Sequence, residues 1–167
     1  MKRTVVYFCV LLAFSCQYTP YEWYNGTLEE AKEIAGSKLI LMKFYTNTWP
    51  SCVRLDVETL RNQEVQAFSK ENLISLKFNA NEEVGNKYYK EYNCQFVPHL
   101  LFLDSHGYEV DRIIGFMPPS EYLLRLENIV NKRNTLADYL ARYKNGEENI
   151  EIIAAIAMKY EDRKIDD

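Results

Sequence analysis

The side chains best suited to chemistry in this sequence are four cysteines, Cys9, Cys16, Cys52 and Cys94. A cysteine thiolate is a nucleophile that exchanges with disulfides and also binds metals. Cys9 and Cys16 lie in an N-terminal segment that the sequence marks for removal or modification. Cys52 and Cys94 are therefore the thiols expected in the working protein. Two cysteines are too few for a disulfide scaffold, so the expected chemistry is that of single thiols.

Other catalytic chemistry has little support in the sequence. His99 and His106 are the only histidines, and neither stands with acids or cysteines at the spacing of metal ligands. We find no glycine-rich phosphate loop and no Ser-His-Asp signature, which argues against nucleotide enzymes and hydrolases. We therefore expect no metal and no cofactor.

Composition indicates one folded core with an appendage. The 167 residues are 47% hydrophobic and 14% aromatic, which is enough to bury a single core. Lys and Arg number 20 against 24 Asp and Glu, and without Lys2 and Arg3 the balance becomes 18 against 24. The resulting net charge of about −6 argues against nucleic acid as a partner.

Residues 1–16 have the order of features found in a secretory signal peptide. Lys2 and Arg3 precede an apolar run at residues 5–14, which ends in the small residues Ser15 and Cys16. The run is too short to span a membrane. We therefore predict export to the cell envelope.

The end of this segment leaves two interpretations open. Residues 12–16 (LAFSC) resemble a bacterial lipobox, in which the cysteine is lipidated and becomes the first residue of the mature chain. Phe14 is bulky for that motif, and the alternative is an ordinary signal peptide cleaved near Cys16. The protein is accordingly expected in the periplasm or as a membrane-anchored lipoprotein, with residues 17–20 as a short tether.

Capping signals and periodicity predict alternating helices and strands. Residues 27–30 (TLEE) form a capping box, and the helix that they open is expected to end near Gly36. Residues 39–45 are apolar or aromatic with one exception, which predicts a strand covered on both faces. Pro50 suits the first turn of a helix that runs to about residue 60.

The remaining elements of the core follow by the same signals. They are a short helix capped by Asn62, strands at 73–78 and 98–103, and a helix at 82–91. The turn cluster 104–107 (DSHG) predicts that residues 108–114 pair antiparallel with the preceding strand. A last helix is expected to be capped by Ser120. The predicted order is αβαβαββα.

Residues 135–167 have a different character and predict a helical hairpin. Apolar residues recur at helical spacing on either side of a break at Asn145 and Gly146. This pattern resembles a single tetratricopeptide-like unit, and such units usually occur in arrays. Three roles stay open for a single copy: docking on the core, binding a partner, or belonging to a longer array.

The order of elements resembles that of the thioredoxin superfamily over residues 21–134. The similar stretches follow one another at the family's spacing, at residues 40–44, 45–60, 77–81, 92–98 and 100–104, then Gly107 and Gly115. Residues 92–98 (YNCQFVP), with the strand, turn and glycines after them, resemble the family's tyrosine, valine, cis-proline, strand, turn and glycine series. The resemblance implies an α/β, thioredoxin-like fold with a central mixed β-sheet flanked by helices, followed here by the C-terminal helical hairpin.

The resemblance places the family's active-site loop at residues 48–52 (TWPSC). Counted from Phe44, Cys52 falls on the family's second, less exposed cysteine, and Trp49 falls on the first, nucleophilic one. The usual Cys-x-x-Cys motif is thus reduced to one cysteine. A single thiol closes the two-step dithiol cycle but still allows mixed disulfides with a client. The alternative is that Cys52 is an inert buried thiol.

The resemblance also implies a groove for the client polypeptide. The Val97–Pro98 peptide bond is expected to be cis, and in the family it forms the wall against which substrate backbone pairs. Trp49, Pro50 and Ser51 are expected to line the same groove. The implied partners are extended peptides or unfolded, thiol-containing client proteins.

Lys43 stands where the family often keeps a buried acid. A lysine buried without a partner is costly. One hypothesis places Lys43 near the Cys52 sulfur, where it favours the thiolate and modulates its pKa. The alternative pairs Lys43 with Asp56 or Glu58.

Cys94 occupies a position at which the family usually packs an apolar residue, so we expect it in the core. A disulfide between Cys52 and Cys94 is the alternative, and it requires Cα atoms within about 7 Å. Tyr88, Tyr89 and Tyr92 are expected to form one helix face against the sheet.

Two functional classes remain open. The first is a cell-envelope protein related to thiol-disulfide oxidoreductases and isomerases, which uses Cys52 alone as a candidate catalytic thiol. The second is a non-catalytic member of the same fold, which binds peptide or protein partners through the groove and the helical tail. The fold does not choose between them.

Overall fold

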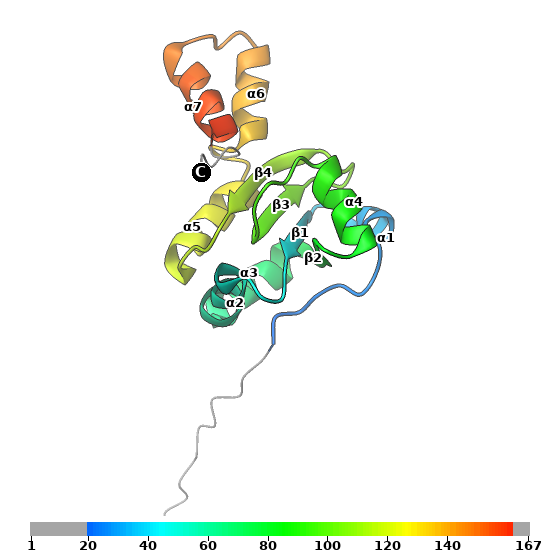
Figure 1. Cartoon of the computed structure of the whole chain (residues 1–167). Helices are drawn as coiled ribbons and strands as arrows, with labels where there is room; N and C mark the ends of the chain where they lie inside the picture. The colour runs from blue at the N-terminus through cyan, green and yellow to red at the C-terminus, as the bar shows by residue number, and fades with distance from the viewer. Residues whose placement is uncertain (1–19, 162–167) are drawn as a thin grey trace, which may run out of the picture.

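The computed structural model describes residues 20–161 as a sheet of four strands covered by helices on both faces (Figure 1). The predicted signal peptide and lipobox lie outside the described residues. Within the described part, no helix is both long and apolar enough to cross a membrane.

The sheet has the strand order β2-β1-β3-β4, with β2 and β4 at its edges. Its strands are β1 (Leu39–Tyr45), β2 (Leu73–Asn79), β3 (His99–Leu103) and β4 (Glu109–Ile114). β1 pairs parallel with β2 and antiparallel with β3, and β3 pairs antiparallel with β4. The sheet is therefore mixed, and the predicted hairpin of the last two strands is confirmed.

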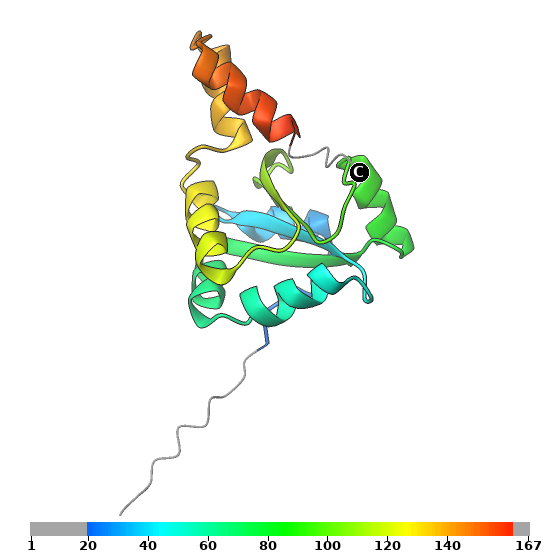
Figure 2. The ribbon, with the colours of Figure 1, turned by 60° about the vertical axis from the view of Figure 1, so that its left-hand side comes forward.

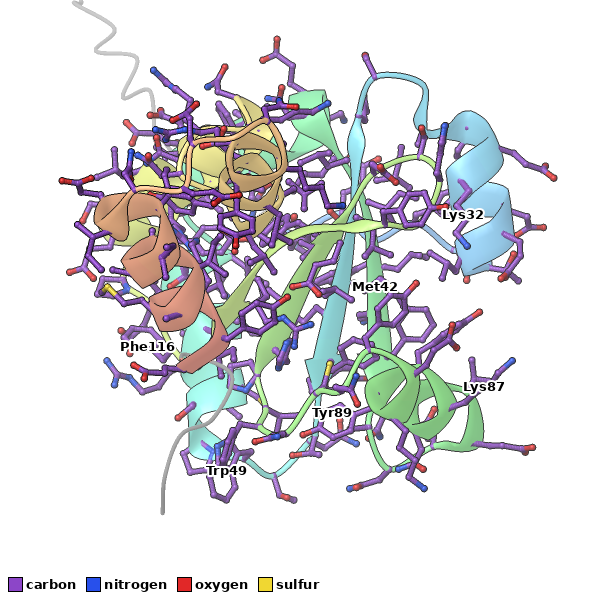
Figure 3. All side chains as sticks on the ribbon, turned by 90° about the horizontal axis from the view of Figure 1, so that it is seen from above. Lys32, Met42, Trp49, Lys87, Tyr89 and Phe116 are labelled. Carbon is purple, nitrogen blue, oxygen red and sulfur yellow. The ribbon has the colours of Figure 1, made fainter. Side chains whose placement is uncertain are left out.

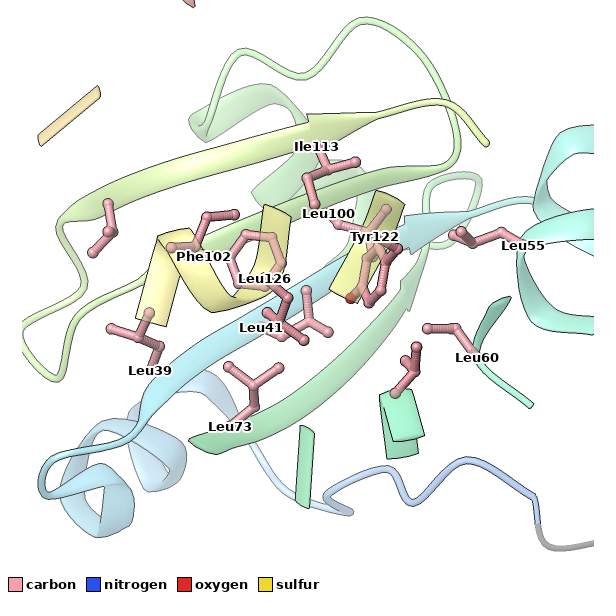
Figure 4. Close-up of a cluster of buried hydrophobic side chains, with 13 residues drawn as sticks. Leu39, Leu41, Leu55, Leu60, Leu73, Leu100, Phe102, Ile113, Tyr122 and Leu126 are labelled. Atoms are coloured by element: carbon pink, nitrogen blue, oxygen red, sulfur yellow. The ribbon is translucent and has the colours of Figure 1, made fainter. Parts of the chain in front are cut away.

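The helices fall into two layers that Figure 2 shows on opposite sides of the sheet. They are α1 (Leu28–Ala35), α2 (Pro50–Arg54), α3 (Gln63–Asn72), α4 (Glu83–Glu91) and α5 (Pro119–Val130). Residues from α3 and α5 pack with Leu41, Leu100 and Phe102 in one apolar cluster (Figure 4). Residues from α1 and α4 pack with Ile40, Met42 and Phe44 in the other cluster. β1 is thus covered on both faces, as its apolar sequence predicted.

Local signals explain where most helices begin. Thr27 accepts a hydrogen bond from Glu30 N while the Glu30 carboxylate accepts one from Thr27 N, so the predicted capping box is present. The Asn62 side chain caps α3 as expected. Ser120, however, does not cap α5: the helix begins at Pro119 with Pro118 as its N-cap. Proline is suited to the first helical position because it has no N–H to satisfy there.

The predicted helix from Pro50 to about residue 60 is continuous but changes its winding. After α2, the segment η1 (Leu55–Thr59) is a π-helix, and Leu60 N donates to Leu55 O at 2.9 Å. Such wide turns are uncommon and often occur at functional sites. The segment carries Asp56, whose carboxylate binds a side chain of β1.

A segment before α1, residues 20–26, lies beside the edge strand β2. We call this segment the strap. Tyr24 N donates to Ser75 O at 2.7 Å, which joins the strap to the edge strand. Tyr21 and Trp23 pack against the core beneath it.

The predicted C-terminal hairpin consists of α6 (Leu136–Lys144) and α7 (Ile150–Glu161). α6 packs against the other edge strand, and each helix of the hairpin buries an apolar residue, Leu136 and Ile152. Lys159 of α7 and Arg125 of α5 both donate to the buried carboxylate of Asp111 on β4, at 2.5 and 2.8 Å. Asp111 therefore helps to tie the hairpin to the core.

Replacing Asp111 with Asn should lower the free energy of unfolding by about 3 kcal/mol, because it leaves two cations without the buried carboxylate that pairs them. Urea denaturation measures the change. Glu121→Gln, on the exposed face of α5, is the matched control and should cost less than about 0.5 kcal/mol. Equal losses in the two variants would show that Asp111 does not hold the hairpin.

Candidate functional site

The loop after β1 exposes a tryptophan and buries a cysteine. Trp49 is the N-cap of α2, Pro50 occupies the first helical turn, and Cys52 N donates to Trp49 O at 3.0 Å. Trp49 is 54% exposed, whereas Cys52 is 1% exposed. Figure 3 shows Trp49 beyond the end of β1, at the edge of the molecule. The indole of Trp49 is therefore accessible in this loop, whereas the thiol of Cys52 is buried.

Burial dominates the electrostatics of Cys52. Loss of solvent raises the pKa of the thiol, while a backbone hydrogen bond from Thr46 and the Lys43 charge lower it, and Asp56 raises it again. The net pKa is above the ordinary value. The Lys43 charge thus acts in the direction that favours the thiolate, and burial outweighs it.

Lys43 lies in the same place as the thiol and has a definite partner. Lys43 is 1% exposed, and its ammonium donates a hydrogen bond to the carboxylate of Asp56 on η1. Burial lowers the pKa of Lys43, and the hydrogen bond and charge of Asp56 oppose that shift. Glu58, the other proposed partner, binds Arg54 instead. Lys43 is therefore both paired with Asp56 and close to Cys52.

Two aromatic rings complete the surroundings of this ammonium. Its Nζ lies 5.6 Å from the ring centre of Trp23 and 5.5 Å from that of Tyr45. The face of an aromatic ring attracts a cation, so both rings help to stabilise the buried charge. Sequence reasoning missed Trp23, because the strap that carries it contains no helix or strand pattern.

Val97 and Pro98 lie beside the start of the Cys52 loop. Phe44 pairs with His99 across β1 and β3, so the antiparallel register brings the residues before His99 alongside those after Phe44. The Val97–Pro98 peptide bond is cis. Gly115 N donates to Pro98 O at 2.9 Å, which fixes this turn against the end of β4. Val97 is half-buried and packs against the apolar cluster formed with α1 and α4.

Cys94 belongs to a different part of the molecule. It is buried in the cluster formed with α1 and α4, as predicted, and Tyr88, Tyr89 and Tyr92 pack against that same cluster. Burial, with a further contribution from Cys94, raises the pKa of Tyr89 to about 12. Cys52 lies with Lys43 on the opposite face of β1. No disulfide joins the two cysteines, because the sheet separates them.

The remaining candidate residues do not form a site with Cys52. His99 is buried and faces Phe44 with ring centres 6.5 Å apart. His106 lies in the turn between β3 and β4. Residues 20–161 contain no group of three or more histidine, cysteine or acidic side chains placed to hold a metal ion.

Comparison with known families decides the class of this fold. The family model described as a thioredoxin-like domain matches residues 24–129, which is more than half of the chain. The chain belongs to the thioredoxin-like domain family. The resemblance seen in the sequence and the expected fold are thereby confirmed.

Solved thioredoxin-like structures match over the same part of the chain. A putative disulphide-isomerase from Bacteroides thetaiotaomicron is 24% identical with a TM-score of 0.60, covering 68% of this chain and 96% of its own. A thioredoxin from Thermus thermophilus is 20% identical with a TM-score of 0.58, covering 66% and 88%. A DsbH oxidoreductase is 17% identical with a TM-score of 0.57, covering 69% and 88%.

These identities are low enough that the structures inform on the fold alone. Among curated proteins, none matches the sequence. The arrangement around Cys52 therefore provides the evidence for the function of this thioredoxin-like domain.

The Lys43→Met substitution should raise the pKa of Cys52 further, because it removes the charge that opposes the effects of burial and of Asp56. The pH dependence of Cys52 alkylation, followed by mass spectrometry of the peptide that contains it, measures this shift. Lys77→Met is the control, since Lys77 also lies over the Trp23 ring but is exposed. Identical profiles for wild type and Lys43→Met would rule out an influence of Lys43 on the thiol.

Proposed function

We propose that this thioredoxin-like protein exchanges disulfides with client polypeptides through a single thiol, Cys52. The observation that carries the proposal is the position of the Cys52 thiol, in the first turn of α2 and within the electrostatic reach of the Lys43 ammonium. A helix N-terminus and a nearby cation both stabilise a thiolate. The family to which the chain belongs supports the same chemistry.

The proposed reaction needs no second cysteine in the protein. The Cys52 thiolate attacks a client disulfide, a bond forms between Cys52 and one client sulfur, and the other client sulfur leaves as a thiolate. A client thiolate then attacks the mixed disulfide and releases Cys52. The client's disulfides are rearranged without net oxidation or reduction, which is the outcome of an isomerase.

The client backbone is expected to bind in a groove between the Cys52 loop and the Val97–Pro98 segment. Trp49 and Pro50 are exposed and Ser51 and Val97 are half-buried, so this surface mixes accessible apolar groups with backbone. An extended segment bound there would pair its backbone with that of the groove, which gives affinity with little sequence preference.

The burial of Cys52 limits the rate of disulfide exchange with a client. Because burial raises the thiol pKa, only a small fraction is thiolate at neutral pH. The loop at residues 46–49 must also move before a client sulfur can approach. We therefore expect slow turnover.

A non-catalytic binding role is the second candidate, and the same burial favours it. With Cys52 at 1% and Trp49 at 54% exposure, a client meets the indole before it meets the sulfur. In this case the groove and the exposed loop hold an extended partner, and Cys52 only fills space behind them.

Native-state alkylation and refolding of a scrambled-disulfide substrate separate the two candidates. The monothiol proposal expects measurable labelling of Cys52 and isomerase activity that falls to background in Cys52→Ser. Cys94→Ala is the matched control and should retain the activity, since Cys94 lies across the sheet. A Cys52→Ser variant with full client binding and unchanged activity would instead support the binding role.

We also propose that the protein works in the cell envelope. The support is the pattern of residues 1–16, with its basic start, apolar run and terminal cysteine. Thiol exchange suits this location, because disulfides persist in oxidising compartments.

The lipoprotein interpretation predicts that Cys16→Ser releases the protein from the membrane fraction, because the variant lacks the sulfur that carries the lipid. Fractionation and the mass of the mature N-terminal peptide measure this. Cys9→Ser, within the predicted signal, is the control and should leave the distribution unchanged. A soluble wild type with an unmodified N-terminal peptide would support the ordinary signal peptide.

A further inference from the structure

A pocket lies between the strap, the helix α3 and the start of the edge strand β2. Its volume is about 820 Å³, and its walls include Tyr21, Trp23, Ser69 and Ser75. Small-molecule sites in proteins are commonly of about 300–1,000 Å³. The pocket involves neither Cys52 nor the Val97–Pro98 segment, although its wall includes Trp23, whose ring also lies near the Lys43 ammonium. We call it the strap pocket.

The wall of the strap pocket contains the hydroxyl groups of Tyr21, Ser69 and Ser75. Tyr21 Oη and Ser75 Oγ are hydrogen bonded at 3.0 Å. Ser69, on the buried face of α3, is 3% exposed, and its Oγ has no hydrogen-bond partner in the described part of the chain. Burial raises the pKa of Tyr21, and the Ser69 and Ser75 side chains oppose this shift. A buried hydroxyl left without a partner is costly, so a polar group entering the pocket would be stabilised here.

A fourth hydroxyl lies deeper in the same region. Tyr122 is fully buried, and its Oη has no hydrogen-bond partner among residues 20–161. Burial and the neighbouring Tyr21 raise its pKa. The Tyr122 hydroxyl therefore lies in the apolar core near Tyr21, and Tyr122 is not one of the residues that line the strap pocket.

The walls and rim define the class of ligand. Tyr21 and Trp23 form an aromatic wall with ring centres 4.6 Å apart. Two ammonium groups line the pocket: Lys70 pairs with Glu22 at 3.0 Å, and Lys38 donates to the backbone oxygen of Lys70 at 2.8 Å. Lys38 forms no ion pair with a carboxylate in the described part, and its ammonium has three hydrogens to donate. It can therefore attract an anion.

We propose that the strap pocket binds a small amphipathic anion, with an aromatic or apolar body and one negatively charged group. The body lies against Tyr21 and Trp23, the charge lies near Lys38, and a polar atom of the ligand reaches the hydroxyls of Ser69 and Ser75. The ligand holds the strap on the edge of β2, where one backbone hydrogen bond now joins them.

A matched pair of dyes tests the proposal on the full mature chain. The chain has two tryptophans, so a Trp49→Phe variant leaves Trp23 as the reporter inside the pocket. The anionic dye 8-anilino-1-naphthalenesulfonate should bind saturably at one per chain and quench Trp23. Its uncharged counterpart, N-phenyl-1-naphthylamine, should bind more weakly, because it lacks the group that Lys38 attracts.

Charge reversal at the rim tests the role of Lys38. Lys38→Glu should weaken binding of the sulfonate roughly tenfold and leave the uncharged amine unaffected. Lys90→Glu, an exposed change on α4 across the sheet, is the control and should change neither dye. Equal effects of the two reversals, equal affinities of the two dyes, or no saturable quenching of Trp23 would each overturn the proposal.

Discussion

The ion pair between the buried ammonium of Lys43 and the half-exposed carboxylate of Asp56 is the constraint on which the rest of the site depends. Lys43 stands in the central strand, where its neighbours are apolar. A charge in such a place is tolerated only when it is paired and hydrogen bonded. Asp56 supplies the pair from η1, so the segment after Cys52 must stay close to β1. Asp56 belongs to the π-helical segment η1, which therefore contacts β1 through this ion pair.

This constraint decides how the active-site loop is presented. With η1 held against β1, α2 begins where Cys52 is buried and Trp49 is exposed to solvent. The lysine lowers the pKa of the thiol, but the burial that comes with the same packing raises it more. The packing that places the Lys43 ammonium near the Cys52 sulfur also buries that sulfur. In the proposed function, a thioredoxin-like protein built this way would exchange disulfides slowly.

A buried charge also constrains the C-terminal half of the molecule. Asp111 is buried on an edge strand and binds two cations from different helices, one of them in the C-terminal hairpin. Asp111 thus helps to hold the hairpin against β4, and the strap lies against the other edge strand, β2. Covered edges prevent unwanted pairing with other chains. The proposed client would bind at the end of the sheet near the exposed Trp49.

Much of the fold could be predicted because its signals are local. The capping box at Thr27, the cap at Asn62 and the apolar run of β1 each specify an element without reference to the rest of the chain. The motif around Pro98 indicated the family for the same reason. The proline pair at the start of α5 was misjudged, since Ser120 is a good cap in isolation but Pro119 fits the first turn better.

The site was harder to predict because it depends on distant contacts. Sequence reasoning brought Lys43 to Cys52 and offered two acids as partners, but only the packing of η1 selects Asp56 over Glu58. Nothing in the sequence of the strap indicates that Trp23 lies near the ammonium. The sign of the net shift in the pKa of Cys52 depends on how much solvent the fold removes, which residue types do not reveal.

The most direct test of this dependence is a double-mutant cycle on the Lys43–Asp56 pair. The free energy of unfolding is measured for wild type, Lys43→Met, Asp56→Asn and the double variant. Asp56→Asn leaves the buried Lys43 ammonium without its carboxylate, Lys43→Met leaves a half-exposed carboxylate without its cation, and the double variant removes both charges. We expect the double variant to be more stable than the sum of the single losses implies, by about 2 kcal/mol or more. Losses that add within about 0.5 kcal/mol would contradict the central role of the pair, because the two residues would then be independent.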